Sequence, residues 1–298
     1  MDIKNGIGPS KVFLPNTGRD QTYLIDFLVD KFPVIPRDEW VSRMNDALVF
    51  NQEGVPQFPD ALYQSNTYIY YYRRVQNEEL IPFEEQIVYQ DEHLLIADKP
   101  HFLPVTPGGH YLQETLLVRL RNKTGIQDLS PIHRIDRETA GLVAFSKIPS
   151  ERDIYQSLFR ERQVLKVYEA IAPYLDELKD QFPIHYQSRI EESKQFMQMH
   201  EVDGEPNSDT TIHLLEVKSS WAKYRLELGS GKKHQLRVHL SALGMPIQYD
   251  QIYPELKPHM RQGQDYSKPL QLVARQLSFV DPITGRQRDF HSSFSVSL

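Results

Sequence analysis

Residues 131–145 read PIHRIDRETAGLVAF, a charged loop followed at once by an apolar run. The run from Gly141 to Phe145 carries no charge and is short, so it predicts a buried strand. Immediately before it, Asp136 stands between two arginines. Such a cluster fits a solvated loop, a metal site, a pair of catalytic carboxylates, or a single catalytic aspartate held among cations.

The composition predicts a folded protein with a normal core. The chain has 298 residues, of which 40% are hydrophobic and 25% charged, enough for one large domain or a main domain with a small companion. The absence of cysteine excludes disulfides and thiolate-bound zinc and suits the cytoplasm. With no secretory leader pattern at the start and no apolar run of membrane length, we expect a soluble, cytoplasmic protein without a membrane partner.

Hydrophobic periodicity divides the chain into two parts. Residues 22–31 and a segment beginning near Pro36 predict helices, and residues 66–75 predict a strand, so residues 1–85 form a small N-terminal domain of helices and a β-hairpin. In residues 86–298 the predicted strands outnumber the helices and do not alternate with them. We therefore expect an α+β fold with a largely antiparallel mixed sheet.

Asp136 is the first candidate for a chemical role. Arg134 and Arg137 flank it, and nearby cations favour an ionised carboxylate, which can be a nucleophile, a base or an electrostatic stabiliser. The alternative without a chemical role is an ordinary salt bridge in a loop. Because Glu138 follows two residues after Asp136, the pair could also belong to a two-carboxylate hydrolase of the glycosidase type. The simpler interpretation is that Glu138 is a solvated acid in a loop.

Histidines do not form a convincing metal site. His234 and His239 are five residues apart, a spacing that does not place them on one helix face, and His133 lies far away in the sequence. We therefore expect no bound metal.

A second cluster of charged residues is basic. The chain as a whole has a net charge of −6, which argues against a protein that binds nucleic acid indiscriminately. The cluster begins with GSGKKH at residues 229–234, whose lysines and backbone N–H groups suit an anion, although a solvated helix start is an equal alternative. In the following helix, Leu236 belongs to the apolar stripe, whereas His234 and Arg237 lie on another face. Upstream, strand alternation places Lys166 and Tyr168 on one face, where a tyrosine most often packs in the core.

Taken in order, these stretches resemble the RluA-type pseudouridine synthases. HRIDRETAGLVAF resembles the family's central H-R-L-D motif, and LLIADKPHFLPVTP resembles its strand-D-K-P-x-x-L segment, with Asp98 where Asn is commoner. RQVLKVYEAI resembles R-x-V-x-K-x-Y, and SGKKHQLRVHLSALGMPIQYD resembles T-G-R-x-H-Q-I-R-x-H-L-x-x-x-G-x-P-I-x-x-D. The resemblance covers roughly residues 86–298, and the two long motifs are specific.

The resemblance implies the pseudouridine synthase fold with a central catalytic cleft, and an isomerase that converts uridines of ribosomal or transfer RNA to pseudouridine without a cofactor. The implied catalytic residues are Asp136, Arg237, which pairs with it, and Tyr168, which packs against the target base and is a candidate for assisting proton removal from C5. Whether the aspartate attacks the sugar, attacks the base or removes a sugar proton stays open. The residues expected to contact RNA are Arg134, which fills the space of the flipped nucleotide, His133, Lys232, Lys233, His234 and Lys99.

Several departures from the family pattern bear on RNA affinity and substrate choice. Ala140 replaces the usual serine, Ser230-Gly231-Lys232 replaces Thr-Gly-Arg, and Val273 replaces a histidine. Lys232 keeps the charge but lacks the bidentate fork of arginine. The N-terminal domain follows the order of a small RNA-binding module but is acidic where that module carries a basic helix. A catalytically idle RNA-binding relative is therefore the alternative, and a monomer is the expected state.

Overall fold

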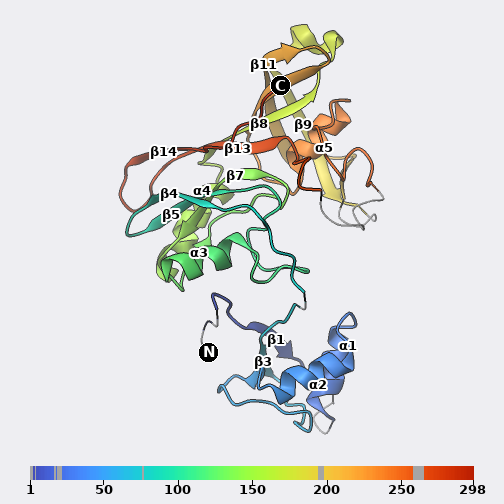
Figure 1. Cartoon of the computed structure of the whole chain (residues 1–298), viewed down its shortest axis with the longest axis vertical. Coiled ribbons are helices and arrows are strands. Elements are labelled where there is room, and N and C mark those ends of the chain that lie inside the picture. The colour runs from blue at the N-terminus through green and yellow to red at the C-terminus, as the bar shows by residue number, and fades with distance from the viewer. Residues whose placement is uncertain are drawn as a thin grey trace. The chain divides into compact units, whose positions relative to one another are not determined.

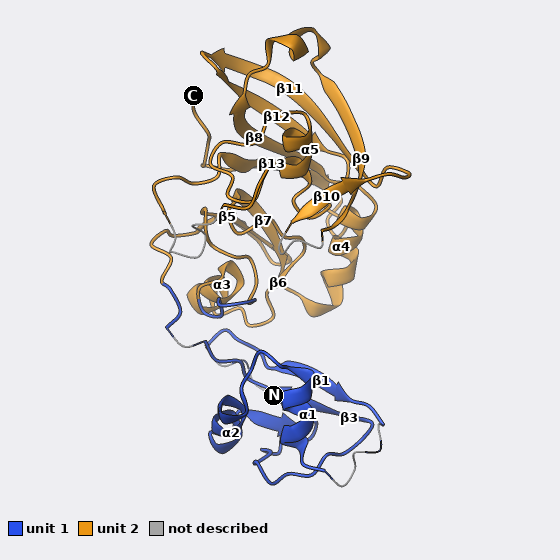
Figure 2. Cartoon of the chain, turned by 90° about the vertical axis from the view of Figure 1, so that its right-hand side faces the viewer, with its two compact units in different colours: residues 1–79, 108–113 blue, residues 80–107, 114–298 orange. Residues whose placement is uncertain are grey.

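The computed structural model describes residues 3, 5–16, 18, 22–75, 77–193, 198–257 and 265–298. It divides into a small unit, residues 1–79 and 108–113, and a large unit, residues 80–107 and 114–298 (Figure 2). The sequence places the boundary between residues 85 and 86, a few residues further on. Within the described ranges, no helix is both long and apolar enough to cross a membrane.

The small unit is a three-stranded antiparallel sheet with two helices packed on one face. Its strands, in the order β1-β3-β2, are β1 (Ser10–Leu14), β2 (Val49–Asn51) and β3 (Thr67–Tyr71). Helices α1 (Leu24–Lys31) and α2 (Arg37–Asn45) contribute Leu28 and Trp40 to a core shared with Val12 and Ile69. The sequence predicts both helices and β3 but misses the short strands β1 and β2. In β1 the exposed Phe13 between two buried apolar residues hides the alternation.

The large unit is built on one extended, mostly antiparallel sheet (Figure 1). Its main path runs β10-β9-β11-β12-β8-β13-β7-β5-β4, and β14 and β6 pair with β13 and β7. Among the described strands only β7 and β13 run parallel. The bounds are β4 (Gln86–Gln90), β5 (Leu94–Lys99), β6 (Ser130–Pro131), β7 (Ala140–Ser146), β8 (Leu165–Pro173), β9 (Ile184–Glu192), β10 (Met199–Val202), β11 (Ser208–Lys218), β12 (Trp221–Leu228), β13 (Leu272–Val280) and β14 (Gln287–His291).

Helices α3, α4 and α5 accompany this sheet, with short 3-10 turns at Pro149–Glu151 and Asp176–Gln181. Helix α3 (Leu116–Thr124) ends where Gly125 adopts a left-handed conformation, which glycine accepts without strain. Helix α4 (Arg152–Arg160) packs on β5, β7 and β13, and α5 (Gln235–Ala242) packs on β8, β11 and β12. The architecture is the expected α+β class with a largely antiparallel mixed sheet.

Gly141 is required where β7 meets β13. It has a φ of 114°, and a Cβ at this position would lie 2.6 Å from the backbone nitrogen of Ala274. The parallel pairing of Ala274 with Gly141 holds β13 beside β7 and so joins the two halves of the sheet. A side chain here would strain the backbone and push the strands apart.

We predict that Gly141→Ala lowers the free energy of unfolding by about 3 kcal/mol, because left-handed strain and overpacking act together. Gly125→Ala is the matched control. It also has a positive φ, of 74°, but a Cβ added there would meet no atom within 4 Å. Its cost should be about 1 kcal/mol. Urea denaturation of both variants checks this, and equal losses would contradict the role assigned to Gly141.

Candidate active site

All of the sequence-predicted site residues except Lys99 line a cavity of about 650 Å³ in the large unit. Three segments supply most of its wall: the loop between β6 and β7, the start of β8, and the turn leading into α5. Each segment adjoins or begins a strand of the same sheet. Residues about 100 positions apart in the sequence, such as Asp136 and Arg237, therefore meet at one cavity. The lining includes His133, Arg134, Asp136, Tyr168, Lys232, Lys233, His234, Leu236 and Arg237.

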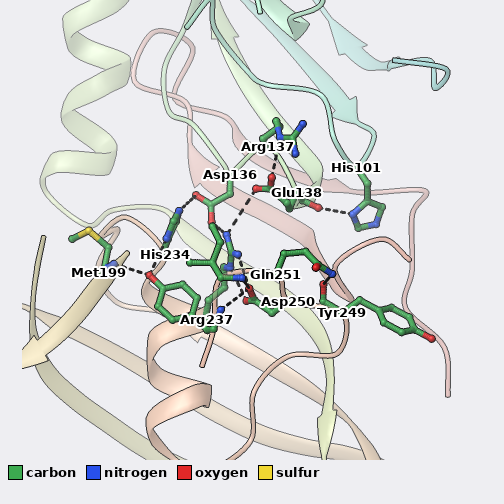
Figure 3. A network of polar contacts seen from close by, with 12 residues as sticks. His101, Asp136, Arg137, Glu138, Met199, His234, Arg237, Tyr249, Asp250 and Gln251 are labelled. Atoms are coloured by element: carbon green, nitrogen blue, oxygen red, sulfur yellow. Dashed lines mark hydrogen bonds and ion pairs between the residues drawn. The ribbon is translucent and has the colours of Figure 1, made fainter. Parts of the chain in front are cut away.

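Asp136 faces the cavity and is held by a buried arginine (Figure 3). The Nη1 of Arg237 donates to its Oδ2 at 3.3 Å. Nε and Nη2 of the same guanidinium donate to the two carboxylate oxygens of Asp250 at 2.8 and 2.7 Å. Because Asp250 binds two nitrogens along one edge of the planar guanidinium, the remaining nitrogen points at Asp136.

Asp250 is itself immobilised by backbone groups. Its Oδ1 also accepts the N–H groups of Ile252 and Tyr253 at 2.8 and 3.1 Å. Burial alone would lower the pKa of Arg237, but the hydrogen bonds and the negative charge of Asp250 outweigh that effect and raise the pKa above its ordinary value. The guanidinium is therefore permanently charged, and Asp136 always faces a cation. The sequence motif G-x-P-I-x-x-D contained Asp250, but nothing in the sequence indicated that it anchors the arginine.

His234 approaches the other oxygen of Asp136. Its Nε2 lies 3.9 Å from Oδ1 of Asp136, and its Nδ1 lies 2.9 Å from the hydroxyl of Tyr253. That hydroxyl already accepts the N–H of Met199, so its own proton is available for Nδ1, which favours an Nε2 proton facing Asp136. Burial lowers the pKa of His234, so the ring is neutral at neutral pH. Only 9% of the surface of His234 is exposed, which suits a contact with Asp136 better than the contact with an RNA phosphate expected from the sequence.

Tyr168, on β8, lines the cavity. Burial, and to a lesser extent the charge of Asp136, raises the pKa of Tyr168, so its phenol stays protonated at neutral pH. Leu236 and Leu272 also line this region and make it partly apolar. These three residues therefore offer a partly apolar surface with a neutral hydroxyl near the Asp136 carboxylate, a surface suited to a planar base.

Glu138 is bound up in ion pairs outside the cavity lining. It pairs with Arg137 at 2.9 Å, and its second oxygen lies 3.9 Å from Arg237. Burial would raise its pKa, but the two arginines outweigh that effect and hold the pKa of Glu138 below its usual range. Glu138 is therefore ionised and cannot serve as the protonated acid that a two-carboxylate hydrolase requires.

Lys99 and His133 support the loop from behind. Lys99 is fully buried, and its Nζ donates to the carbonyls of Pro100 and Arg137 at 2.9 and 3.0 Å, so it does not reach the surface on which RNA was expected to bind. His133 touches the cavity, but its Nε2 accepts the N–H of Ala144 at 3.1 Å and its ring stacks on Phe159. Both side chains fix the position of Asp136 through the backbone.

The rim of the cavity is cationic. Arg134, Lys232 and Lys233, three of the residues expected to contact RNA, are exposed there, as is Arg160, and the half-buried Lys166 lies beside them. Lys166 donates to the carbonyl of Ser230 at 2.7 Å, and burial lowers its pKa to about 8. Lys166 was not among the site residues expected from the sequence, although the strand alternation places it on the same face as Tyr168. Across the described ranges, no three His, Asp or Glu side chains converge as ligands for a metal ion.

Comparison with known proteins identifies the family. Residues 93–242 match the model described as RNA pseudouridylate synthase. Over 233 residues the chain is 27% identical to an uncharacterized RNA pseudouridine synthase of Synechocystis sp., covering 77% of this chain and 79% of the relative. Over 224 residues it is 29% identical to ribosomal large subunit pseudouridine synthase C of Vibrio cholerae, covering 72% and 67%. These matches confirm the resemblance stated from the motifs.

A solved structure supports the fold. Human RNA pseudouridylate synthase domain containing 1 superposes with a TM-score of 0.57 at 22% identity, covering 71% of this chain and 84% of the human one. The expected fold class is thereby confirmed.

The buried Lys99 makes stability depend on pH. Burial lowers its pKa from 10.5 to about 7, against the opposing effect of Glu138 and Asp136. Between these values the unfolded chain binds the additional proton, so the free energy of unfolding should rise with pH, by up to about 1.4 kcal/mol per pH unit. Below pH 7 both states carry the proton and this contribution levels off. Urea denaturation between pH 6 and 10 should show this slope in the wild type and a flatter one in Lys99→Met; parallel curves would contradict it.

Proposed function

The chain belongs to the RNA pseudouridylate synthase family and is an isomerase of the RluA type, and from this premise we propose that it converts specific uridines of ribosomal or transfer RNA to pseudouridine with Asp136 as the central catalytic group. The observation that carries the proposal is the carboxylate of Asp136, open to the cavity and paired with the buried Arg237. The remaining residues of the cavity take roles around this group.

The reaction exchanges one bond of the nucleoside for another. The bond from uridine N1 to the sugar C1′ breaks, the base rotates, and C5 forms the new bond to C1′. The proton on C5 leaves to water, and N1 takes up a proton, so atoms and electrons balance without an oxidant or reductant. Asp136 supplies the negative charge beside the reacting sugar and base, in any of the three mechanistic versions.

Arg237 holds that charge in place. Its two bonds to Asp250 spare only Nη1 for Asp136, so the carboxylate is oriented before the substrate enters. A preorganised ion pair avoids the reorganisation that the same groups would need in water. The neutral His234 assists by presenting an N–H toward the second oxygen of Asp136.

Tyr168 and Leu236 receive the base. A planar base released from the sugar needs a flat, apolar surface on which it can turn without escaping, and both residues line the cavity beside Asp136. Because burial keeps the phenol of Tyr168 protonated, we propose that it packs against the base and donates a hydrogen bond, rather than acting as a base for the C5 proton.

The cationic rim binds the RNA backbone. The glycosidic bond of a stacked nucleotide is inaccessible, so the target must flip into the cavity. Lys232 and Lys233 are exposed at the mouth and suit the flanking phosphates, and the exposed Arg134 suits the space that the flipped nucleotide leaves. The cytoplasmic location and the monomeric state expected from the sequence stay predictions.

The first test measures release of tritium from RNA labelled at uridine C5. We expect the wild type to release tritium from RNA of cells lacking the protein, and Asp136→Asn to release none, because the amide carries no charge at the reacting centre. Fractionating the RNA into ribosomal and transfer pools identifies the substrate class.

A retained fold is the necessary control, measured as an unchanged thermal unfolding profile of Asp136→Asn. Tight RNA binding without release by the wild type, from every pool, would favour the idle relative over the proposed enzyme. Release by Asp136→Asn at the wild-type rate would remove Asp136 from the centre of the mechanism.

A second prediction separates the isomerase from a two-carboxylate hydrolase. Glu138→Gln should retain tritium release within about tenfold of the wild type, because Glu138 supports Arg137 and Arg237 instead of meeting the substrate. If catalysis used Asp136 and Glu138 together, Glu138→Gln and Asp136→Asn would lose activity to the same degree.

A further inference from the structure

The small unit has a sheet face that its helices leave uncovered. Residues opposite one another in neighbouring strands point to the same face, and Phe13 pairs with Tyr68 while Lys11 and Phe50 flank Tyr70. The intervening residues, such as Val12 and Ile69, point the other way into the core with α1 and α2. One side of this sheet is therefore a row of aromatic rings with a lysine. We call it the aromatic face, defined by Lys11, Phe13, Phe50, Tyr68 and Tyr70.

The rings of the aromatic face are accessible. Phe13 is 44% exposed and Tyr68 39%, although phenylalanine is among the residues most often buried. Their centroids lie 5.1 Å apart at an interplanar angle of 56°, so the two rings form one continuous apolar surface. The Nζ of Lys11 lies over the ring of Tyr68, 5.2 Å from its centroid, and adds a positive charge to this surface.

Charge distinguishes the two sides of the small unit. The sequences of the three strands, SKVFL, VFN and TYIYY, contain Lys11 as their single charged residue and no carboxylate. On the helical side, by contrast, Arg37 and Arg43 are each paired with a carboxylate, Asp26 and Glu39, at 2.7 Å. A polyanion is therefore better accommodated on the sheet side than on the helical side.

We propose that the aromatic face binds a single-stranded segment of RNA by stacking bases on Phe13 and Tyr68, with Lys11 facing a phosphate. Aromatic rings on an open sheet stack bases in a largely sequence-independent way, because every base has a π-face. The inference rests on RNA being the substrate of the large unit, and it gives the small unit a function that its acidic helices do not suggest. Strands of this length offer room for about two bases.

Leucine substitutions test the proposal without emptying the site. Phe13→Leu and Tyr68→Leu keep apolar volume but remove the ring, so the fold should survive. We expect the double variant of the full chain to bind a fluorescent, cytidine-only RNA oligonucleotide at least about fivefold more weakly than the wild type. Such an RNA holds no uridine for the active site. Tyr23→Leu is the matched control, because Tyr23 is 51% exposed but directly precedes α1 in the helical layer.

Photo-crosslinking locates the contact directly. RNA carrying 5-iodocytidine should crosslink to Phe13 or Tyr68, with the adduct identified by mass spectrometry. Unchanged affinity of the double variant, or crosslinks confined to the large unit, would overturn the proposal. So would a dimer that dissociates in the double variant while RNA affinity stays the same, because the face would then be an interface between two copies.

Tritium release measured in parallel separates this proposal from the proposed function. Normal release by the wild type with unaffected binding in the double variant rejects only the aromatic face. Weakened binding in the double variant, with no release by the wild type from any RNA pool, rejects only the isomerase mechanism.

Discussion

The buried ion pair between Arg237 and Asp250 is the constraint on which the candidate active site depends. A guanidinium removed from water must be matched by carboxylates and hydrogen bonds, and Asp250 meets this requirement with both oxygens. The arrangement leaves one nitrogen, which faces Asp136 across the cavity. The same arginine therefore both satisfies the buried Asp250 and orients the carboxylate of Asp136.

The sheet brings these partners together. Asp136 lies on the loop leading into β7, whereas Arg237 is on α5, which packs over β8 and β12. Between these halves β13 pairs with both β7 and β8, and the absent side chain of Gly141 allows the close parallel contact. Lys99 and His133 then fix the loop from within through backbone carbonyls and an N–H group. The charged cluster is thus rigid because buried groups bond its backbone.

The two units distribute charge differently. The large unit concentrates exposed cations at the rim of one cavity in a chain whose net charge is −6, so a local field, and not the overall charge, attracts RNA. In the small unit the only charged residue on the strands is Lys11, beside exposed rings. Both surfaces suit RNA by different physical means, one through phosphates and the other through bases.

The family, the α+β class, the two N-terminal helices, the strand that follows the charged loop, and the candidacy of Asp136, Tyr168 and Arg237 could all be predicted from the sequence alone. These follow from local periodicity and from motifs whose spacing survives in the linear order. The folded structure was needed to show that Asp250 anchors Arg237, that Glu138 lies outside the cavity lining, and that Lys99 is buried beneath the loop instead of facing RNA. Burial and pairing depend on which distant segments meet, and a linear pattern does not contain that information.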